Sequence, residues 1–491
     1  MIPLLPIIAA LAQTSRQDTP PGVVDRITTV GKDLDALRER VGELQQIVSP
    51  RPDGPIDRLD VFHGYVPVFI IAFLVTLFAT PIMRRLALAN GIIDRPSEAR
   101  KVHRIPIAYL GGVAVFLGLM AGIGYSYIAS IKPGMLDFHT TRYLDNDGEH
   151  HVVPLSVIFG MWLIMIVGLI DDVAGIAPRL KVGGQLVAAA ALAATDVGVK
   201  VAAGLIVPAA KAIGLHTVDV NNSQTVLFQI PLPIPVAGFD HISIDLVYWA
   251  GTAIIAVFVL GACNASNLID GLDGLLAGST AITSLGLLVI ALGLAVADDG
   301  ARDSPRIILC LALLGACLGF LPHNFNPATI FLGDAGSLLL GFSTIVIILM
   351  LGDTGQTKLV VAGLIIYAIP IIDTVLAIIR RRLAGKSIST ADDQHLHHML
   401  KRSLGVRGAV FALYAIGVGF AILGIAMSLG RARVAYSIAL VFAAFIGVTA
   451  IKIARRKQIE EQAVFYASGA RSDVAVPPPV SGRDARSASP G

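Results

Sequence analysis

The chain has 491 residues, of which 55% are hydrophobic and only 15% are charged, and its mean hydropathy is +0.73. A soluble globular domain carries about 25% charged residues, so the composition excludes an ordinary soluble protein. The net charge of +3 gives no reason to expect a nucleic-acid partner. Long apolar runs separated by short charged segments predict a polytopic α-helical membrane protein, because a helix needs about 20 apolar residues to cross a bilayer.

The first 55 residues differ from the rest of the chain. Residues 1–12 are apolar, which fits either a short signal peptide or a hydrophobic segment that rests on the membrane. In residues 24–48 the apolar side chains alternate three and four positions apart, which predicts a short coiled coil or an amphipathic helix. Such a helix is marginal by itself and needs a packing partner. Residues 49–55 resemble a linker.

A transmembrane domain is predicted for residues 56–455. The apolar runs lie near residues 61–82, 108–131, 154–170, 183–207, 247–265, 274–296, 306–322, 329–351, 359–379, 408–429 and 434–452. The loop at residues 208–246 contains a stretch that predicts a small β-hairpin. The tail at residues 456–491 is rich in Pro, Ser and Arg and is predicted to be disordered. The expected fold class is an all-α polytopic membrane protein with about 11 transmembrane helices.

The basic residues predict how these spans are oriented. With the N-terminus outside, the inside loops include residues 83–107, 171–182 and 380–407, and these loops and the tail hold most of the Lys and Arg that flank the spans. Cytoplasmic loops are enriched in Lys and Arg. We therefore predict an outside N-terminus, a cytoplasmic C-terminus and a periplasmic hairpin.

Five polar motifs fall on the predicted cytoplasmic side, where an ionisable group at the end of an apolar span is a candidate for function. The first motif contains Asp171 and Asp172, which directly follow an apolar helix. Two adjacent carboxylates at a helix C-terminus oppose both each other and the helix dipole. A cation is therefore expected beside them, supplied by a metal or by Lys181. A solvated helix end is the alternative.

The second and third motifs offer hard oxygen atoms. Asn267, Asp270 and Asp273 are spaced three apart, so on a helix they would share one face. Such a face suits Mg²⁺, which takes one or two protein ligands together with waters and substrate phosphates; polar contacts between helices are the alternative. Asp334 opens a hydrophobic helix, where it could cap the helix or ligate a cation next to a bound phosphate.

The fourth and fifth motifs are basic or imidazole-rich. His395, His397 and His398 could bind zinc, but no further ligand lies at zinc-site spacing, so hydrogen bonding to a phosphate or a sugar fits better. A polar loop is the alternative. Lys101 and His103 belong to a basic loop that the charge asymmetry of membrane proteins explains by itself. Together the motifs supply the carboxylates, amides and cations that phosphoryl transfer requires.

In the order "DRP…RKVH", "DD…PRLK", "NASNLIDGLDGL", "FLGDAGS" and "HLHH", these motifs resemble those of the polyprenyl-phosphate N-acetylhexosamine-1-phosphate transferase family. The resemblance covers residues 61–455. The segment "IAYLGG" favours the sugar-1-phosphate branch, because the relative that makes lipid I typically has "PTMGG" there. The resemblance implies transfer of an N-acetylhexosamine 1-phosphate, with GlcNAc first, from a UDP-sugar to undecaprenyl phosphate. It also implies a bacterial inner-membrane enzyme with a cytoplasmic active site.

The resemblance further implies roles for single residues. Asn267 and Asp334 would contact Mg²⁺, with Mn²⁺ as an alternative ion. Asp171 would activate the polyprenyl phosphate with Asp172 beside it, and Lys181 would hold phosphate. The other implied substrate contacts, on the nucleotide, the sugar and the diphosphate, are Lys101, His103, Asp270, Asp273, Phe331, His395, His397 and His398. Relatives often carry a basic residue where this chain has Asp393, which leaves the sugar open.

Two other functions fit parts of this pattern. Phospho-MurNAc-pentapeptide transferases of peptidoglycan synthesis share the core motifs. A secondary transporter also uses intramembrane acids, but it predicts inverted repeats and acids near mid-span, whereas these acids cluster at the span ends on one side. The expected partners are a UDP-N-acetylhexosamine, undecaprenyl phosphate and the lipid bilayer, and a homodimer is compatible with the sequence.

Overall fold

A computed structural model gives the fold of most of the transmembrane domain. It describes residues 57–94, 106–132, 135–136, 152–214, 217–220, 223–236, 239–297, 303–353, 355–383 and 395–430, and a few positions between 437 and 459. The predicted signal peptide, coiled coil and linker within residues 1–55 lie outside the described residues, as does nearly all of the C-terminal tail.

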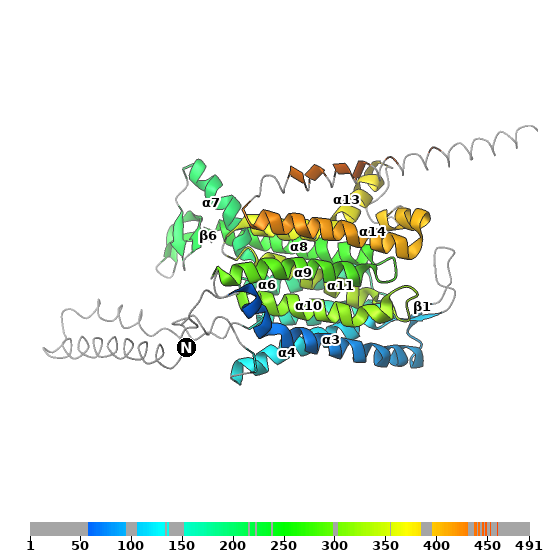
Figure 1. Ribbon diagram of the computed structural model, residues 1–491. Coiled ribbons are helices and arrows are strands. Elements are labelled where there is room, and N and C mark those ends of the chain that lie inside the picture. Colours follow the sequence, from blue (N-terminus) through cyan, green and yellow to red (C-terminus); the bar gives the residue numbers. More distant parts are fainter. Residues whose placement is uncertain are drawn as a thin grey trace, which may run out of the picture. The chain divides into compact units, whose positions relative to one another are not determined.

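Most of the predicted spans are long single helices. Eight helices of the described part are long and apolar enough to cross a membrane: α3 (Arg58–Ala89), α4 (Gly111–Ile131), α5 (Leu155–Ala174), α8 (Leu246–Ile269), α9 (Leu275–Val296), α10 (Asp303–Asn324), α11 (Gly333–Met350) and α14 (Leu396–Ser428). Their positions agree with eight of the apolar runs found in the sequence. The protein is therefore a mostly helical membrane protein (Figure 1).

Two further predicted spans are broken by sharp bends. α6 (Pro178–Ala194) leads through the 3₁₀ helix η2 (Val199–Ala202) into α7 (Ala203–Ala212) with a bend of 84°, and α12 (Thr357–Ile366) leads into α13 (Ala368–Leu383) with a bend of 78°. The apolar runs near residues 183–207 and 359–379 gave the place of these two spans but did not predict the bends. At the first bend, Asp196 and Gly198 adopt positive φ angles, which a right-handed helix cannot continue through.

The predicted number of eleven spans is reached only in part. If each bent pair counts as one span, the described residues contain up to ten. The eleventh apolar run, at residues 434–452, falls mostly outside the described residues.

Short antiparallel strand pairs occupy the loops. The strands are β1 (Ile93–Asp94) with β2 (Ile107–Ala108), β3 (Val218–Val220) with β4 (Ser223–Thr225), and β5 (Leu227–Val236) with β6 (Phe239–Asp245). The pair β5 and β6 lies in the stretch where the sequence predicts a hairpin, and its place on the periplasmic side stays a prediction. β2 also bridges to the chain ahead of α11, since Ala108 pairs in parallel with Ile330.

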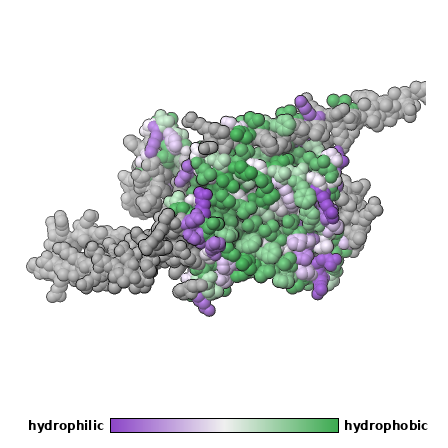
Figure 2. Space-filling model, in the orientation of Figure 1, coloured by the Kyte–Doolittle hydropathy of each residue, from purple (hydrophilic) through white to green (hydrophobic). Residues whose placement is uncertain are grey.

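α11 is the central helix of the bundle. Every residue from Ala335 to Met350 is buried, and α11 packs against α5, α8 and α4. α3 and α14, by contrast, bury far less of their apolar surface inside the protein. Figure 2 shows a broad apolar surface across the middle of the helices, with hydrophilic residues toward both ends. A helix that is apolar all round belongs in a core, whereas the outer helices suit contact with lipid.

Glycines let the backbones of α4 and α5 reach the start of α11. A Cβ on Gly112 of α4 would lie 2.1 Å from the backbone nitrogen of Gly336, and a Cβ on Gly168 of α5 would lie 2.5 Å from Cα of Ala335. Side chains larger than a hydrogen atom would therefore push these helices apart. Close packing at this point brings the end of α5 next to the start of α11.

We expect Gly168→Ala to lower both thermal stability and any activity of the site at the start of α11. The added methyl group meets backbone atoms of Ala335 that cannot rotate away, and overpacking of this kind costs about 1–3 kcal/mol. Thermal unfolding of the purified protein in detergent measures the effect. Gly183→Ala on α6 is the matched control, because nothing lies within 4 Å of its added Cβ. Equal stability of both variants would contradict the proposed role of the close contact.

Candidate active site

One ammonium group bridges two carboxylates at the end of the helix bundle. Lys181 Nζ lies 2.6 Å from Oδ2 of Asp171 and 2.6 Å from Oδ2 of Asp334. The three side chains come from the last turn of α5, the first turn of α6 and the first turn of α11. The second oxygen of Asp171 accepts a 2.9 Å hydrogen bond from the backbone N–H of Ile176, which fixes the turn between α5 and α6. Both carboxylates thus face a common place for positive charge.

Asn267 joins this group from the last turn of α8. Its Nδ2 donates to Oδ1 of Asp334 at 2.8 Å and lies 2.9 Å from Oγ of Ser337. Asp334 therefore contacts Lys181 with one oxygen and Asn267 with the other. The sequence predicted these polar residues on one side of the membrane, and the structure brings four helices together around Asp334.

Asp172 points the other way and holds the start of α11. Its Oδ1 accepts from the backbone N–H of Asp334 at 2.7 Å, and its Oδ2 accepts from that of Ala335 at 3.0 Å. A carboxylate at this position satisfies N–H groups that have no partner within the helix and interacts favourably with the helix dipole. The alternative in which Asp334 itself caps α11 was wrong, because the cap position is Leu332 and the capping carboxylate comes from α5.

The acidic motif after α8 is not one continuous helix. α8 ends at Ile269, and a short loop through Asp270 and Asp273 leads to α9. The prediction that both acids share a helical face with Asn267 was therefore wrong. Gly274 ends the loop with a φ of +79°, a conformation that favours glycine. Released from the helix, Asp273 accepts hydrogen bonds from Asn326 Nδ2 at 2.9 Å and from the backbone N–H of Ala328 at 3.0 Å.

A cavity of about 690 Å³ opens beside the Asp334 group. The predicted site residues in its lining are Asn267, Asp270, Asp273, Phe331, Asp334 and His398. Asp171 and Lys181 border it through their contacts with Asp334. A volume of this size falls within the range of about 300–1,000 Å³ that is usual for ligand pockets.

The far wall of the cavity contains residues that the sequence analysis did not single out. Asn324 accepts from the backbone N–H of Gly274 at 3.0 Å and donates to the carbonyl of Ile330 at 3.1 Å, so it joins the loop before α9 to the loop before α11. Arg84 of α3 donates to the carbonyl of Thr329 at 3.0 Å. Asn324 could have been found from the sequence, because it is a polar residue at the end of an apolar span. The acidic residues were identified by the same criterion.

The electrostatics of the cavity favour a bound cation. Withdrawal from water raises the pKa of Asp270 to about 8, and repulsion by the carboxylates of Asp334 and Asp172 adds to the shift. Burial likewise raises the pKa of Tyr109, with Asp94 contributing. Carboxylates that gather away from water are stabilised when a positive charge joins them. The oxygen atoms of Asp171, Asp334 and Asn267 are the donor set that Mg²⁺ prefers.

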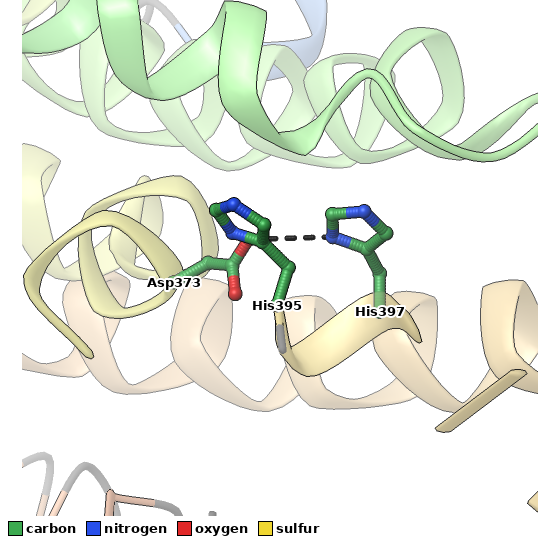
Figure 3. A group of neighbouring side chains, drawn as sticks. All are labelled: Asp373, His395 and His397. Carbon is green, nitrogen blue, oxygen red and sulfur yellow. Dashed lines mark hydrogen bonds and ion pairs between the residues drawn. The ribbon is translucent and has the colours of Figure 1, made fainter. Parts of the chain in front are cut away.

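The histidine motif lies at the start of α14 and has a partner that the sequence did not reveal. Asp373 of α13 lies 3.0 Å from Nδ1 of His395 and 3.3 Å from Nδ1 of His397, both measured to Oδ2 (Figure 3). His398 turns to the cavity instead. Asp373 sits within an apolar stretch 22 positions before His395, so no local spacing indicated the contact. The predicted substrate contacts Lys101 and His103 lie outside the described residues.

Comparison with known proteins places this geometry in a family. The sequence profile of glycosyl transferase family 4 matches residues 154–352. A decaprenyl-phosphate N-acetylglucosaminephosphotransferase of Mycolicibacterium smegmatis is 33% identical over 418 residues, which cover 79% of this chain and 88% of the relative. The chain belongs to the polyprenyl-phosphate N-acetylglucosamine-1-phosphate transferases of glycosyl transferase family 4. The family predicted from the order of the motifs is confirmed.

Other members of the family show where the similarity is stronger. A probable undecaprenyl-phosphate N-acetylglucosaminyl 1-phosphate transferase of Bacillus subtilis is 32% identical over 365 residues, or 74% of this chain and 84% of the relative. A phospho-N-acetylmuramoyl-pentapeptide-transferase of Bacillus cytotoxicus is 29% identical over 369 residues, or 72% of this chain and 95% of the relative. The N-acetylglucosamine branch is thus more similar than the peptidoglycan branch.

We expect Asp172→Asn to lower thermal stability more than Asp171→Asn does. An asparagine at position 172 would turn its NH₂ group toward one of two N–H donors of α11, and an unsatisfied buried group costs about 1–3 kcal/mol. An asparagine at position 171 keeps an oxygen for the N–H of Ile176. Melting temperatures in detergent measure the difference. Equal destabilisation by both variants would contradict the capping role of Asp172.

Proposed function

We propose that this protein transfers N-acetylglucosamine 1-phosphate from UDP-N-acetylglucosamine to undecaprenyl phosphate and releases UMP. The observation that carries the proposal is the pair of carboxylates, Asp171 and Asp334, that share Lys181 beside a polar cavity at the end of a membrane bundle. The relatives whose names state this type of transfer support it.

The position of Asp171, Lys181 and Asp334 between the apolar helices and the polar cavity suits two very different substrates. The lipid acceptor carries its phosphate at the membrane surface, where the ends of α5 and α11 lie, and its chain can stay among the apolar outer faces of the helices. The nucleotide sugar is soluble in water and needs a polar cavity. Asp270, Asp273 and Asn326 line such a cavity and offer hydrogen-bonding groups. Phe331 supplies an aromatic face in the same lining, which is suited to a base.

The reaction is a phosphoryl transfer between two phosphates. An oxygen of the lipid phosphate attacks the β-phosphorus of the UDP-sugar and forms the new P–O bond, while the bond from the β-phosphorus to the bridging oxygen of UMP breaks. Asp171 orients the lipid phosphate and accepts its proton where one is present, and Lys181 holds phosphate oxygens by charge. Catalysis of this kind consists mainly of positioning and electrostatic stabilisation.

Asn267 and Asp334 are the residues that would hold Mg²⁺. Their oxygen atoms adjoin the cavity, and the ammonium of Lys181 already lies between Asp334 and Asp171. When bound, the ion would neutralise charge on the diphosphate of the nucleotide sugar. Asp172 keeps Asp334 in place through the backbone of α11.

We further propose that the site faces the cytoplasm of a bacterial inner membrane and starts the synthesis of a cell-envelope polysaccharide. Basic residues support this orientation, because the last turn of α13 holds Arg380, Arg381 and Arg382, and Arg84 lines the cavity. Phospho-MurNAc-pentapeptide is the second donor to consider. The relatives named for it are 27–29% identical, so UDP-N-acetylglucosamine is the donor to test first.

Purified protein should release UMP from UDP-N-acetylglucosamine only when undecaprenyl phosphate and Mg²⁺ are both present. Chelation of divalent cations should stop the reaction, and Mg²⁺ or Mn²⁺ should restore it. A coupled assay for UMP, run with a panel of UDP-N-acetyl sugars, measures the release. Failure of every UDP-sugar in the panel would overturn the proposed function.

Asp171→Asn should reduce UMP release at least about 100-fold, in the range reported for removal of a group that stabilises a transition state. The neutral amide is too weak a base to accept the proton, and it forms no ion pair with Lys181. Asp196→Asn is the matched control, because Asp196 is exposed in the bend after α6 and asparagine tolerates its positive φ of +57°. A turnover of Asp171→Asn equal to that of wild type would remove Asp171 from the mechanism.

A further inference from the structure

Asp373 is a buried carboxylate with three partners at the start of the next helix. Its side chain is only 2% exposed, and a buried charge is costly unless it is paired and hydrogen-bonded. Oδ1 accepts from the backbone N–H of Leu396 at 2.7 Å, and Oδ2 faces Nδ1 of His395 at 3.0 Å and Nδ1 of His397 at 3.3 Å. Asp373 thus ties α13 to the first turn of α14.

These contacts determine which atoms of the histidines remain for a ligand. An ionised carboxylate only accepts hydrogen bonds, so Nδ1 of His395 is the donor to Asp373. The Nε2 atoms lie on the far side of the rings from the Nδ1 atoms. Figure 3 shows both rings projecting from the start of α14, with the carboxylate of Asp373 beside His395. Both side chains are nearly closed to solvent, with exposures of 7% for His395 and 1% for His397.

The free edge of His397 faces the cavity wall. A Cβ built on Gly271 would lie 2.5 Å from Nε2 of His397, so the ring touches the loop between α8 and α9. Gly271 lines the cavity between Asp270 and Asp273, and His398 lines it as well. The ring of His397 therefore lies between Asp373, which faces its Nδ1 atom, and the cavity wall, which faces its Nε2 atom.

We propose that Asp373 is a positioning residue that holds His395 and His397 at the start of α14, so that Nε2 of His397 is presented to the sugar diphosphate of the nucleotide substrate. This role rests on the proposed function. It resembles the way in which a carboxylate sets the tautomer and the orientation of a histidine at other active sites. Asp373 acts through the two rings and does not itself touch the substrate.

A metal centre is the competing interpretation of the same three side chains. Asp373, His395 and His397 are close enough to share an ion. A structural zinc site uses four protein ligands, and the described residues supply these three, with one oxygen of Asp373 already taken by the N–H of Leu396. The geometry therefore favours the positioning role.

Asp373→Asn should lower kcat/KM for UDP-N-acetylglucosamine by 10- to 100-fold and leave KM for undecaprenyl phosphate within about twofold of wild type, in line with the loss of an outer partner of a functional histidine. Asp353→Asn is the matched control. Asp353 is also buried and accepts a backbone N–H, from Gly198 at 3.1 Å. It follows the opposite end of α11, about 27 Å of helix away from Asp334. Asp353→Asn should keep kcat/KM within about threefold of wild type. It removes a buried structural contact of similar kind, but that contact lies far from the nucleotide substrate.

A mutant cycle shows whether Asp373 acts through the histidines. In the background His395→Ala with His397→Ala, adding Asp373→Asn should cause no further loss, whereas independent losses that multiply would overturn the proposal. If Asp373→Asn does not fold, Gly271→Ala replaces it, because its methyl group displaces the ring of His397. Its cost should then vanish in His397→Ala, and a cost that persists there would overturn the proposal.

Two controls separate the possible failures. The first control measures the zinc content of the purified protein. If the wild type binds one zinc ion per chain and Asp373→Asn binds none, the positioning role is overturned in favour of a metal centre. Wild-type protein that turns over no UDP-sugar would overturn the proposed function, and this role with it. An active wild type together with an unaffected Asp373→Asn would overturn only the role of Asp373.

Discussion

The site depends on one contact above all, in which the carboxylate of Asp172 accepts hydrogen bonds from the N–H groups of Asp334 and Ala335 in the first turn of α11. The first N–H groups of a helix have no partner within the helix, and α11 is buried from Ala335 onward. Asp172 supplies the missing acceptor from α5, and the glycines that allow α4, α5 and α11 to touch make the contact short enough. Since Asp171 directly precedes Asp172 in the chain, this anchoring also places the carboxylate of Asp171 opposite Asp334. Packing and chemistry are thus fixed by two neighbouring residues with different tasks.

The site gathers negative charge where water is scarce, and each carboxylate is compensated in a different way. Asp171 and Asp334 share Lys181, Asp172 takes backbone N–H groups, and Asp273 takes an amide and a backbone N–H. Burial raises the pKa of Asp270 to about 8, and repulsion by Asp334 adds to the shift. An arrangement of this kind fits the proposed divalent cation, which would supply the positive charge that Lys181 and the backbone N–H groups provide only in part.

Sequence reasoning was reliable where the signal was local and failed where the chain turns. Ten of the predicted spans correspond to helices or bent helix pairs, because the apolar length of a span is a local property. The bends after Ala194 and Ile366 were missed, since a broken helix stays apolar on both sides. Asn267 and Asp273 were expected on one helix, but the chain leaves the helix at Asp270, so the two side chains bind different walls of the cavity.

The sequence by itself determined the membrane class and the residue types of the candidate site, because hydropathy and the polar residues at the ends of apolar runs can be read along the chain. The order of its motifs, which resembles that of a known family, determined the family. Only the tertiary structure decided which contacts each of those residues makes. Asp171 and Asp172 are adjacent and chemically identical, yet one faces Lys181 and the other caps α11. Asp373 meets the histidines only because α13 and α14 fold against each other. Contacts between helices depend on packing in three dimensions, and the spacing of residues along one helix carries no record of them.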